Sequence, residues 1–175
     1  MLPNEDVFLR RVQISDAKTL LRWENDPNVW SVSERTERLE LEDIRSFILN
    51  QQEASEFEMD QIRYIILSEK QQTLLGTLDL YEIDWNANSA FVGILIADEN
   101  ERGKGFGQSS LKKLFDLATS TLELDLVKAR IQPNNKASIS LFEKTGFQKK
   151  TEIPERILKD GTYIEFFTFE KWLRN

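Results

Sequence analysis

Hydrophobic and polar residues follow two kinds of spacing along this chain. Runs rich in β-branched and aromatic residues predict strands over 7–13, 61–68, 73–85, 89–97, 125–132, 147–153 and 162–173. Apolar residues at helical spacing predict helices over 15–26, 39–52 and 135–146, and a further helix through Leu111 and Leu122. Hairpin turns are expected at 86–89 and 159–161.

The order of these elements, β-α-α-β-β-β-α-β-α-β-β, predicts the fold class. It indicates a mixed α/β domain with a mostly antiparallel central sheet of about seven strands, flanked by about four helices. Ser15 and either Asn134 or Asn135 are expected to cap helices, while Pro27 and Gly146 are expected to mark helix ends. With 175 residues, no repeat and no Pro- or Gly-rich linker, the chain is expected to form one domain over 1–175.

Composition removes several kinds of chemistry. The chain has no Cys and no His, which excludes disulfides, a Ser-His-Asp triad and the commonest metal ligands, so no metal site is expected. No apolar run approaches the roughly 18 residues of a membrane-spanning helix. The first residues lack a basic segment followed by an apolar one, so we expect no signal peptide and a cytoplasmic location.

Charge is distributed unevenly along the chain. The formal net charge is −7, and residues 1–60 carry all of it, with 14 acidic and 7 basic side chains. An acidic chain is a poor partner for nucleic acid, so none is expected. The acidic first third has two interpretations: a solvated surface, or a surface that attracts a cation.

A short glycine-rich stretch departs from this acidic background. Three of the seven glycines stand at alternate positions, Gly103, Gly105 and Gly107, and residues 102–113 contain four basic side chains and no acidic one. The stretch follows a predicted strand and precedes an amphipathic helix, whose first N–H groups lack intrahelical partners and attract anions. It therefore predicts a phosphate cradle, with a tight turn bearing exposed cations as the alternative. The spacing matches neither a P-loop nor a dinucleotide fingerprint.

Two motifs together resemble one family. The loop RGKGFG (102–107) is similar to the Arg/Gln-x-x-Gly-x-Gly/Ala phosphate-binding loop of the GNAT N-acetyltransferases. The segment NKASISLFEKTGF (135–147) resembles their Asn-x-x-Ala/Ser-x-x-Leu-Tyr-x-x-x-Gly-Phe helix. The front of the chain and GTLDLYEIDW (76–85) look most like the branch that contains spermidine N-acetyltransferases and ribosomal-protein N-terminal acetyltransferases.

The resemblance implies acetyl-CoA as cosubstrate, held in a V-shaped gap between strands 89–97 and 125–132. The main chain of 94–96 would pair with the pantetheine arm, the amides from Arg102 to Gln108 would hold the pyrophosphate, and 135–142 would lie near the arm. The cofactor-binding residues implied in this way are Ile94, Leu95, Ile96, Arg102, Gly103, Lys104, Gly105, Phe106, Gly107, Gln108, Asn135, Ser138 and Phe142.

The resemblance also implies direct acyl transfer, in which a neutral amine attacks the thioester. With no His, a carboxylate is the available base, and Asp79 and Glu82 are the candidates. Their opposite parity on one strand places them on opposite faces, so one is expected to face the acceptor, and the better-shielded Asp79 is preferred. Both are alternatively solvated strand residues. Phe142 stands where the family often has a proton-donating Tyr, so Tyr81 or Tyr163 substitutes, or the thiolate leaves unaided.

The acceptor site of the family lies under the first two helices and the loop between them, which is the acidic third of this chain. Trp23, Glu24 and Trp30 are therefore expected to bind the acceptor, with Asp26, Glu34 and Glu37 near the same loop. The expected acceptor is a cationic amine such as a polyamine. The alternatives are a peptide N-terminus, as in a ribosomal protein, and a non-catalytic CoA-binding module, which Phe142 favours. Edge strands and the final FFTFEKWL (166–173) leave a homodimer open.

Overall fold

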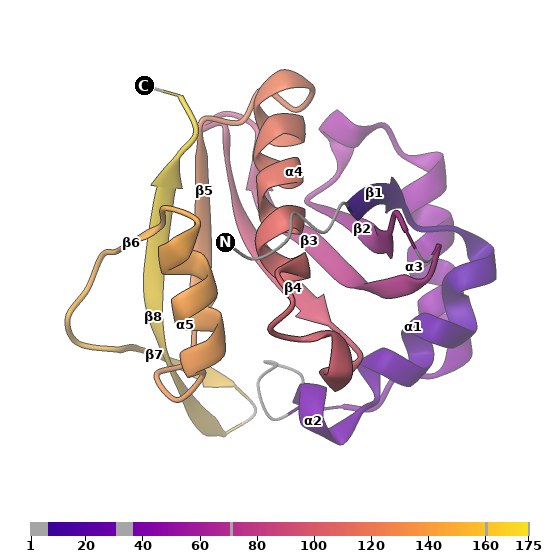
Figure 1. The fold of residues 1–175 in the computed structure, drawn as a ribbon, viewed down its shortest axis with the longest axis horizontal. Helices are drawn as coiled ribbons and strands as arrows, with labels where there is room; N and C mark the ends of the chain where they lie inside the picture. The colour runs from indigo at the N-terminus through magenta and orange to yellow at the C-terminus, as the bar shows by residue number, and fades with distance from the viewer. Residues whose placement is uncertain (1–6, 31–36, 71, 160, 175) are drawn as a thin grey trace.

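The computed structural model describes residues 7–30, 37–70, 72–159 and 161–174 (Figure 1). Single turns of 3-10 helix at 14–16, 56–58 and 99–101 connect some of its elements. Among the described residues, no helix has the length and apolarity needed to cross a membrane. The helices and strands, in chain order, are β1 (Val7–Arg11), α1 (Ala17–Glu24), α2 (Pro27–Trp30), α3 (Leu41–Glu53), β2 (Gln61–Ser68), β3 (Leu74–Asp84), β4 (Ser89–Ile96), α4 (Phe106–Ser120), β5 (Leu126–Ile131), α5 (Lys136–Lys144), β6 (Gln148–Lys149), β7 (Glu155–Lys159) and β8 (Thr162–Trp172).

The strands form one open sheet. Their order is β1-β2-β3-β4-β5-β8-β6, and β7 pairs with β8 beyond this row. All neighbours are antiparallel except β4 and β5, which are parallel and are joined by the crossover helix α4. This confirms the predicted mixed, mostly antiparallel α/β fold.

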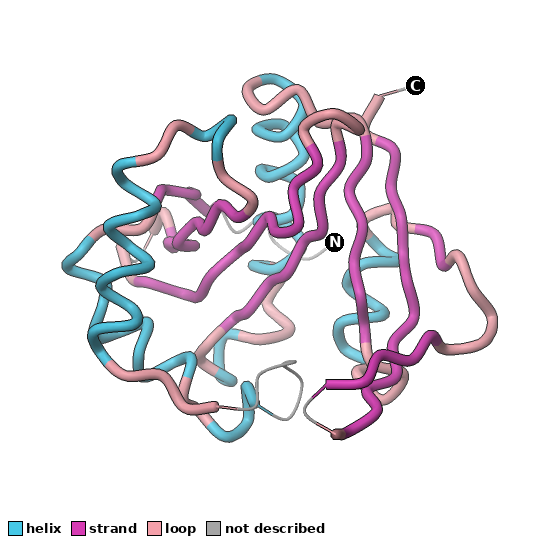
Figure 2. Tube along the Cα trace, turned by 180° about the vertical axis from the view of Figure 1, so that it is seen from behind, coloured by secondary structure: helices cyan, strands magenta, loops and turns pink. Residues whose placement is uncertain are grey.

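Helices cover the two faces of the sheet unequally. On one face, α4 and α5 pack over the sheet, and Leu111 and Leu114 of α4 join one core cluster with Leu78 and Leu80 of β3. On the other face, α1 and α3 form a second cluster around Ile65 of β2. No described helix lies over the back of β5 and β8 (Figure 2).

Three predictions about element boundaries were wrong. Ser15, expected to cap the first helix, lies within the 3-10 turn at 14–16, and Asp16 is the N-cap of α1. The strand expected over 147–153 stops at Lys149, and β7 forms after Pro154, which has no N–H to continue a ladder. The long strand β8 pairs with both pieces in turn, with Lys159 opposite Thr162 at the predicted hairpin. The first helix ends at Glu24, and Pro27 begins the short helix α2, a position where proline is favoured.

Candidate active site

The opening in the sheet lies between β4 and β5. The two parallel strands pair from Ser89 opposite Leu126 to Phe91 opposite Lys128, and their pairing ends there. Beyond this point β4 continues alongside β3, and β5 continues alongside β8. The strands therefore splay apart, as the family resemblance implies for 89–97 and 125–132.

Main-chain groups of β4 point into this opening. The Asn88 carbonyl, just before β4, accepts a hydrogen bond from the Leu126 N–H on the β5 side, with N and O 3.2 Å apart. Because peptide direction alternates along a strand, the groups of Ile94 and Ile96 point the same way. The Ile96 carbonyl accepts a hydrogen bond from Arg102 Nε at 2.9 Å. An extended chain in the opening would thus find the main chain of Ile94 beside it.

Glycine is needed at the three alternate positions for two different reasons. Gly103 has φ +76°, and Gly105, the N-cap of α4, has φ +96°, a region that side chains other than glycine adopt with strain. Gly107 lies inside the helix instead. A Cβ there would come within 3.1 Å of Leu141 Cδ2 on α5, so this glycine allows the two helices to approach closely.

The start of α4 presents unpaired N–H groups. The first intrahelical bond runs from the Ser109 N–H to the Gly105 carbonyl. The N–H groups of 106–108 come before it, so they have no carbonyl one turn earlier to bond. The Arg102 N–H donates to the Glu99 carbonyl and so has an internal partner. Among the expected amides from Arg102 to Gln108, that of Arg102 is therefore already occupied within the chain.

The basic side chains of the loop are balanced by nearby acids. Lys104 Nζ lies 3.0 Å from Glu101 Oε1, and Arg102 Nη1 lies 3.7 Å from Glu99 Oε1. The acid-free window 102–113 did not include these carboxylates, which a turn of 3-10 helix brings back to the loop. The α4 amides and the helix dipole therefore supply positive potential at the cavity that does not depend on these paired side chains.

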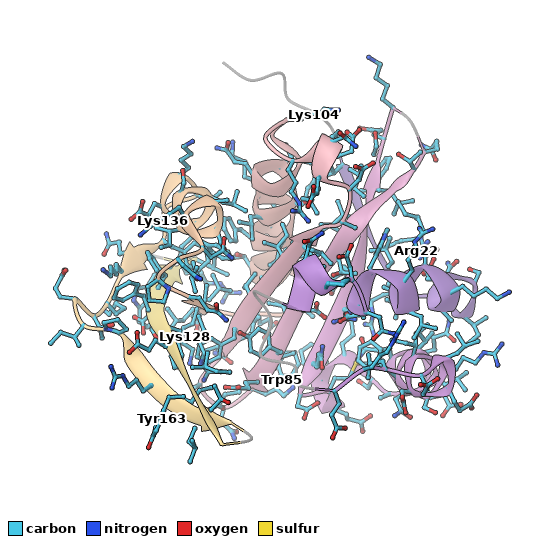
Figure 3. All side chains as sticks on the ribbon, turned by 90° about the horizontal axis from the view of Figure 1, so that it is seen from below. Arg22, Trp85, Lys104, Lys128, Lys136 and Tyr163 are labelled. Atoms are coloured by element: carbon cyan, nitrogen blue, oxygen red, sulfur yellow. The ribbon has the colours of Figure 1, made fainter. Side chains whose placement is uncertain are left out.

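A cavity of about 390 Å³ extends from this loop along the opening. Eleven of the thirteen residues expected on the cofactor side line this cavity, among them Ile94, Leu95, Ile96, Arg102, Gly103, Gly105, Phe106, Gly107 and Gln108. Asn135 and Ser138 line it as well, and Asn135 Oδ1 caps α5 by accepting the Ser138 N–H at 3.1 Å. Lys104 is absent from the lining, and Figure 3 shows it on the α4 and α5 side of the sheet.

Phe142 does not reach the cavity. Its side chain is 2% exposed and packs edge-on against Phe147, with ring centroids 4.9 Å apart. Sequence reasoning also missed lining residues. Leu141 and Lys144 follow Ser138 at helical spacing, so the α5 pattern contained a signal for them. Asn28 and Val29 of α2 had no such signal, because only the fold brings α2 to the cavity.

On the opposite face, two acidic side chains share one arginine. Arg63 Nε donates to Asp79 Oδ1 at 2.7 Å, and Arg63 Nη1 donates to Glu24 Oε1. All three side chains are nearly buried, at 11–13% exposure. Burial alone would lower the pKa of Arg63, but Asp79 and Glu24 raise it above its usual value. Arg63 thus holds two carboxylates, from α1 and β3, close together on this face.

Glu82 lies on the same face as Asp79, so the parity prediction was wrong. The register of β3 against β4 shifts between Tyr81 and Asp84, and Glu82 has φ +47°. This β-bulge puts Tyr81 and Glu82 on one face in succession. Both oxygens of Glu82 accept hydrogen bonds from Arg130, at 2.6 and 2.9 Å. These bonds lower the pKa of Glu82, so the carboxylate stays ionised and its charge is balanced by Arg130.

The other expected acceptor residues separate in the structure. Trp23 packs, half-buried, against the core cluster of α1 and α3. Asp26 Oδ1 accepts the Asn28 N–H and so supports α2. Glu34 and the side chain of Trp30 lie outside the described residues. Tyr163 is 69% exposed on the hairpin of β7 and β8, on the side of the sheet away from α4 and α5 (Figure 3).

A mostly antiparallel sheet that splays between two parallel strands, with a glycine-started helix aimed at the opening, defines an N-acyltransferase that binds an acyl-CoA. The model of the acetyltransferase (GNAT) domain family matches residues 6–148. The chain belongs to this family and is an acetyl-CoA-dependent N-acetyltransferase. The first N–H groups of α4, which follow Gly105 at the N-cap and lack intrahelical partners, fit the diphosphate of that cosubstrate.

Individual relatives are similar at low identity. The chain is 27% identical over 168 residues to an uncharacterized N-acetyltransferase p20 of Bacillus licheniformis, covering 96% of this chain and 93% of that one. It is 28% identical over 101 residues to a spermidine N(1)-acetyltransferase of Vibrio cholerae, covering 58% of each. The crystal structure of a Vibrio cholerae spermidine N-acetyltransferase, in complex with CoA and spermine, has a TM-score of 0.82 at 19% identity and covers 95% of each chain.

Proposed function

We propose that this protein transfers the acetyl group of acetyl-CoA to a primary amine of a small cationic molecule such as a polyamine. The transfer is direct, within a complex of both substrates. One observation carries the proposal. Glu24 and Asp79 both bind Arg63, so two nearly buried carboxylates lie on the β3 side of the opening. A buried negative charge attracts an ammonium group.

Gly93 leaves a path from that charge to the opening. Asp79 lies opposite Gly93 in the β3–β4 register, and Gly93 is two residues beyond the end of the β4–β5 pairing. A Cβ at Gly93 would meet its nearest neighbour, the Tyr81 ring, at 3.7 Å. With no side chain at this position, an amine placed over Gly93 would have Asp79 on one side and the opening on the other.

We assign Asp79 as the base. Gln61 Nε2 and Arg63 Nε both donate to its Oδ1, which orients the carboxylate and leaves Oδ2 available for the substrate. An alkylammonium has a pKa near that of a lysine side chain, about 10.4, so it must lose a proton before it attacks. Asp79 Oδ2 accepts this proton, directly or through a water molecule.

The remaining groups hold the acetyl donor. We assign the main chain of Ile94 and Ile96 to the pantetheine arm and the amides of 103–108 to the diphosphate. As the amine nitrogen forms its bond to the acetyl carbon, the carbon–sulfur bond breaks and the electron pair stays on sulfur. Phe142 has no proton to give and is buried. A thiol pKa near 8.5 allows the thiolate to leave without a donor.

The named relatives support a polyamine acceptor. The Vibrio cholerae relative is a spermidine N(1)-acetyltransferase, and the similar solved structure contains spermine. In this chain the excess negative charge of residues 1–60 is consistent with the same acceptor class.

The test is release of CoA thiol from acetyl-CoA with a panel of amines. The panel contains 1,4-diaminobutane, spermidine, spermine and a peptide with a free N-terminus. We expect turnover with the polyamines. CoA binding without turnover on any amine would instead indicate a non-catalytic CoA-binding module.

The assigned base has its own variant. Asp79→Asn should lower kcat about 10²- to 10⁴-fold, the usual contribution of general base catalysis, while CoA still raises the unfolding temperature. Asp116→Asn, an exposed position on α4, is the matched control and should keep wild-type kcat. Equal activity of the two variants would remove Asp79 from the reaction.

A further inference from the structure

The face of the sheet beside the opening carries a small aromatic cluster that is covered by cations. The rings of Tyr81 and Phe91 stack with centroids 5.6 Å apart. Arg130 Cζ lies 3.9 Å from the Phe91 centroid, and Lys128 Nζ lies 4.6 Å from it. Phe91 is only 8% exposed, and these side chains lie on it. The face of this ring is therefore used for a cation–π contact within the chain.

The same cluster supplies a carboxylate. The β-bulge directs Glu82 to Arg130, and both of its oxygens accept hydrogen bonds from the guanidinium. The ring of Phe166 on β8 lies 5.6 Å from Arg130 Cζ on another side. Aromatic rings with a carboxylate are the groups by which proteins recognise organic ammonium ions. Here a guanidinium of the chain itself occupies them.

Arg130 also lies beside the reaction site. The β4–β5 pairing ends with Phe91 opposite Lys128, so the continued register would set Arg130 across the opening from Gly93. Asp79 lies opposite Gly93 on the other side. An acceptor over Gly93 thus has a negative charge on the β3 side and the cations of β5 on the other.

We propose that Arg130 is a specificity-determining residue for the acceptor, whose guanidinium fills the site where a further ammonium group of a long polyamine would bind. This inference rests on the proposed function. It follows that the wild-type protein favours a short diamine over spermine. An ammonium group that reaches toward β5 and β8 meets the positive charge of Arg130. The charge of Glu82 is already paired with that guanidinium.

The test compares kcat/KM for spermine with kcat/KM for 1,4-diaminobutane. Arg130→Gln should raise the spermine-to-diamine ratio about tenfold, because a ring face and a carboxylate become available to a second ammonium. Arg156→Gln is the matched control, since Arg156 also pairs with a glutamate, Glu165, at 2.6 Å on the same sheet. It should leave the ratio unchanged. A ratio that stays the same in Arg130→Gln, or changes equally in both variants, would overturn the inference.

A double variant checks the mechanism. Arg130→Gln combined with Glu82→Gln should lose most of the gain, because the carboxylate that binds the second ammonium is gone. If the full gain persists, Arg130 does not act by occupying this site. Arg130→Met, which keeps an apolar stem over Phe91, replaces the glutamine variant if circular dichroism shows that the latter is unfolded.

Calorimetric titration of spermine into the CoA-bound proteins separates this inference from the proposed function. Tighter spermine binding by Arg130→Gln, with no acetyl transfer by any protein, would support the inference and reject the proposed function. If polyamines are acetylated but Arg130→Gln changes neither spermine binding nor the spermine-to-diamine ratio, the proposed function is supported and the inference is rejected. Absence of both spermine binding and turnover in all variants would reject both.

Discussion

The two sides of the opening between β4 and β5 are built by different means. On the side of α4 and α5, the groups that face an anion are main-chain amides, set by the left-handed Gly105 and the 15 residues of helix behind it. On the opposite side the polar groups are side chains, and each acidic group meets an arginine. Asp79 meets Arg63, and Glu82 meets Arg130.

This difference shows what controls each side. Main-chain amides are kept in any variant that preserves the backbone conformation. The ability of the α4 side to face an anion therefore depends on the φ angles of the loop and on the absence of side chains that would block the amides. The electrostatics of the opposite side depend on how many carboxylates each arginine binds and on how deeply the ion pairs are buried. Arg63 is 11% exposed and serves two carboxylates, whereas Arg130 is 22% exposed and faces a Glu82 that is 55% exposed.

The largest effect is expected at Arg63. Arg63→Met removes the guanidinium that both nearly buried carboxylates, Glu24 and Asp79, bind, which should lower the free energy of unfolding by about 3–5 kcal/mol. Arg130→Met removes a more exposed pair and should cost at most about 1 kcal/mol. Urea unfolding at pH 7 measures both values. Equal losses would mean that burial does not distinguish the two arginines.

An intermediate effect is expected at Gly105, on the backbone-built side. Gly105→Val should lower stability by about 1–2 kcal/mol, because φ is +96° there, and should abolish stabilisation by CoA. That stabilisation is about 2.7 kcal/mol when CoA is present at 100 times its Kd. The control is Gly161→Val, at φ +78° in the β7–β8 hairpin, which should show similar strain but keep the full CoA effect. If Gly105→Val still responds to CoA, the loop does not hold the diphosphate.

The smallest effect concerns the pH dependence of the exposed pair. Arg130 lowers the pKa of Glu82 in the folded protein below its ordinary value of 4.5. The contribution of the pair to stability is therefore fully present above pH 4.5 and is lost as the pH falls through the lowered pKa. The stability difference between wild type and Glu82→Gln should be below about 1 kcal/mol at pH 7 and should shrink below pH 4.5. A difference that grows in acid would contradict the assigned pair.

The glycine loop was predictable from the sequence because its chemistry is local. The glycine stretch stands at the start of α4, as expected, and Asn135, one of the two expected caps, caps α5. The charge balance of the same loop was not predictable. Lys104 pairs with Glu101, which lies just outside the acid-free window, so the basic run overstated the side-chain charge available to an anion.

The acceptor side was less predictable. The shielding of Asp79 was anticipated correctly from its apolar neighbours, but Glu82 was assigned to the wrong face. The alternation of side chains between the two faces is interrupted there because a β-bulge adds one residue to β3. No residue type at 81–84 predicts this bulge. The partners Arg63 and Arg130 were missed, since nothing in their own strands marks them as functional.

By itself the sequence determined the order of elements, the glycine-started helix and the cap of α5, because propensity, capping and backbone conformation act between residues a few positions apart. Only the tertiary structure decided which arginine each carboxylate meets. Glu24 meets Arg63 across 39 positions, and Glu82 meets Arg130 across 48. Coulomb interactions depend on separation in space and on burial, and the folded sheet sets both.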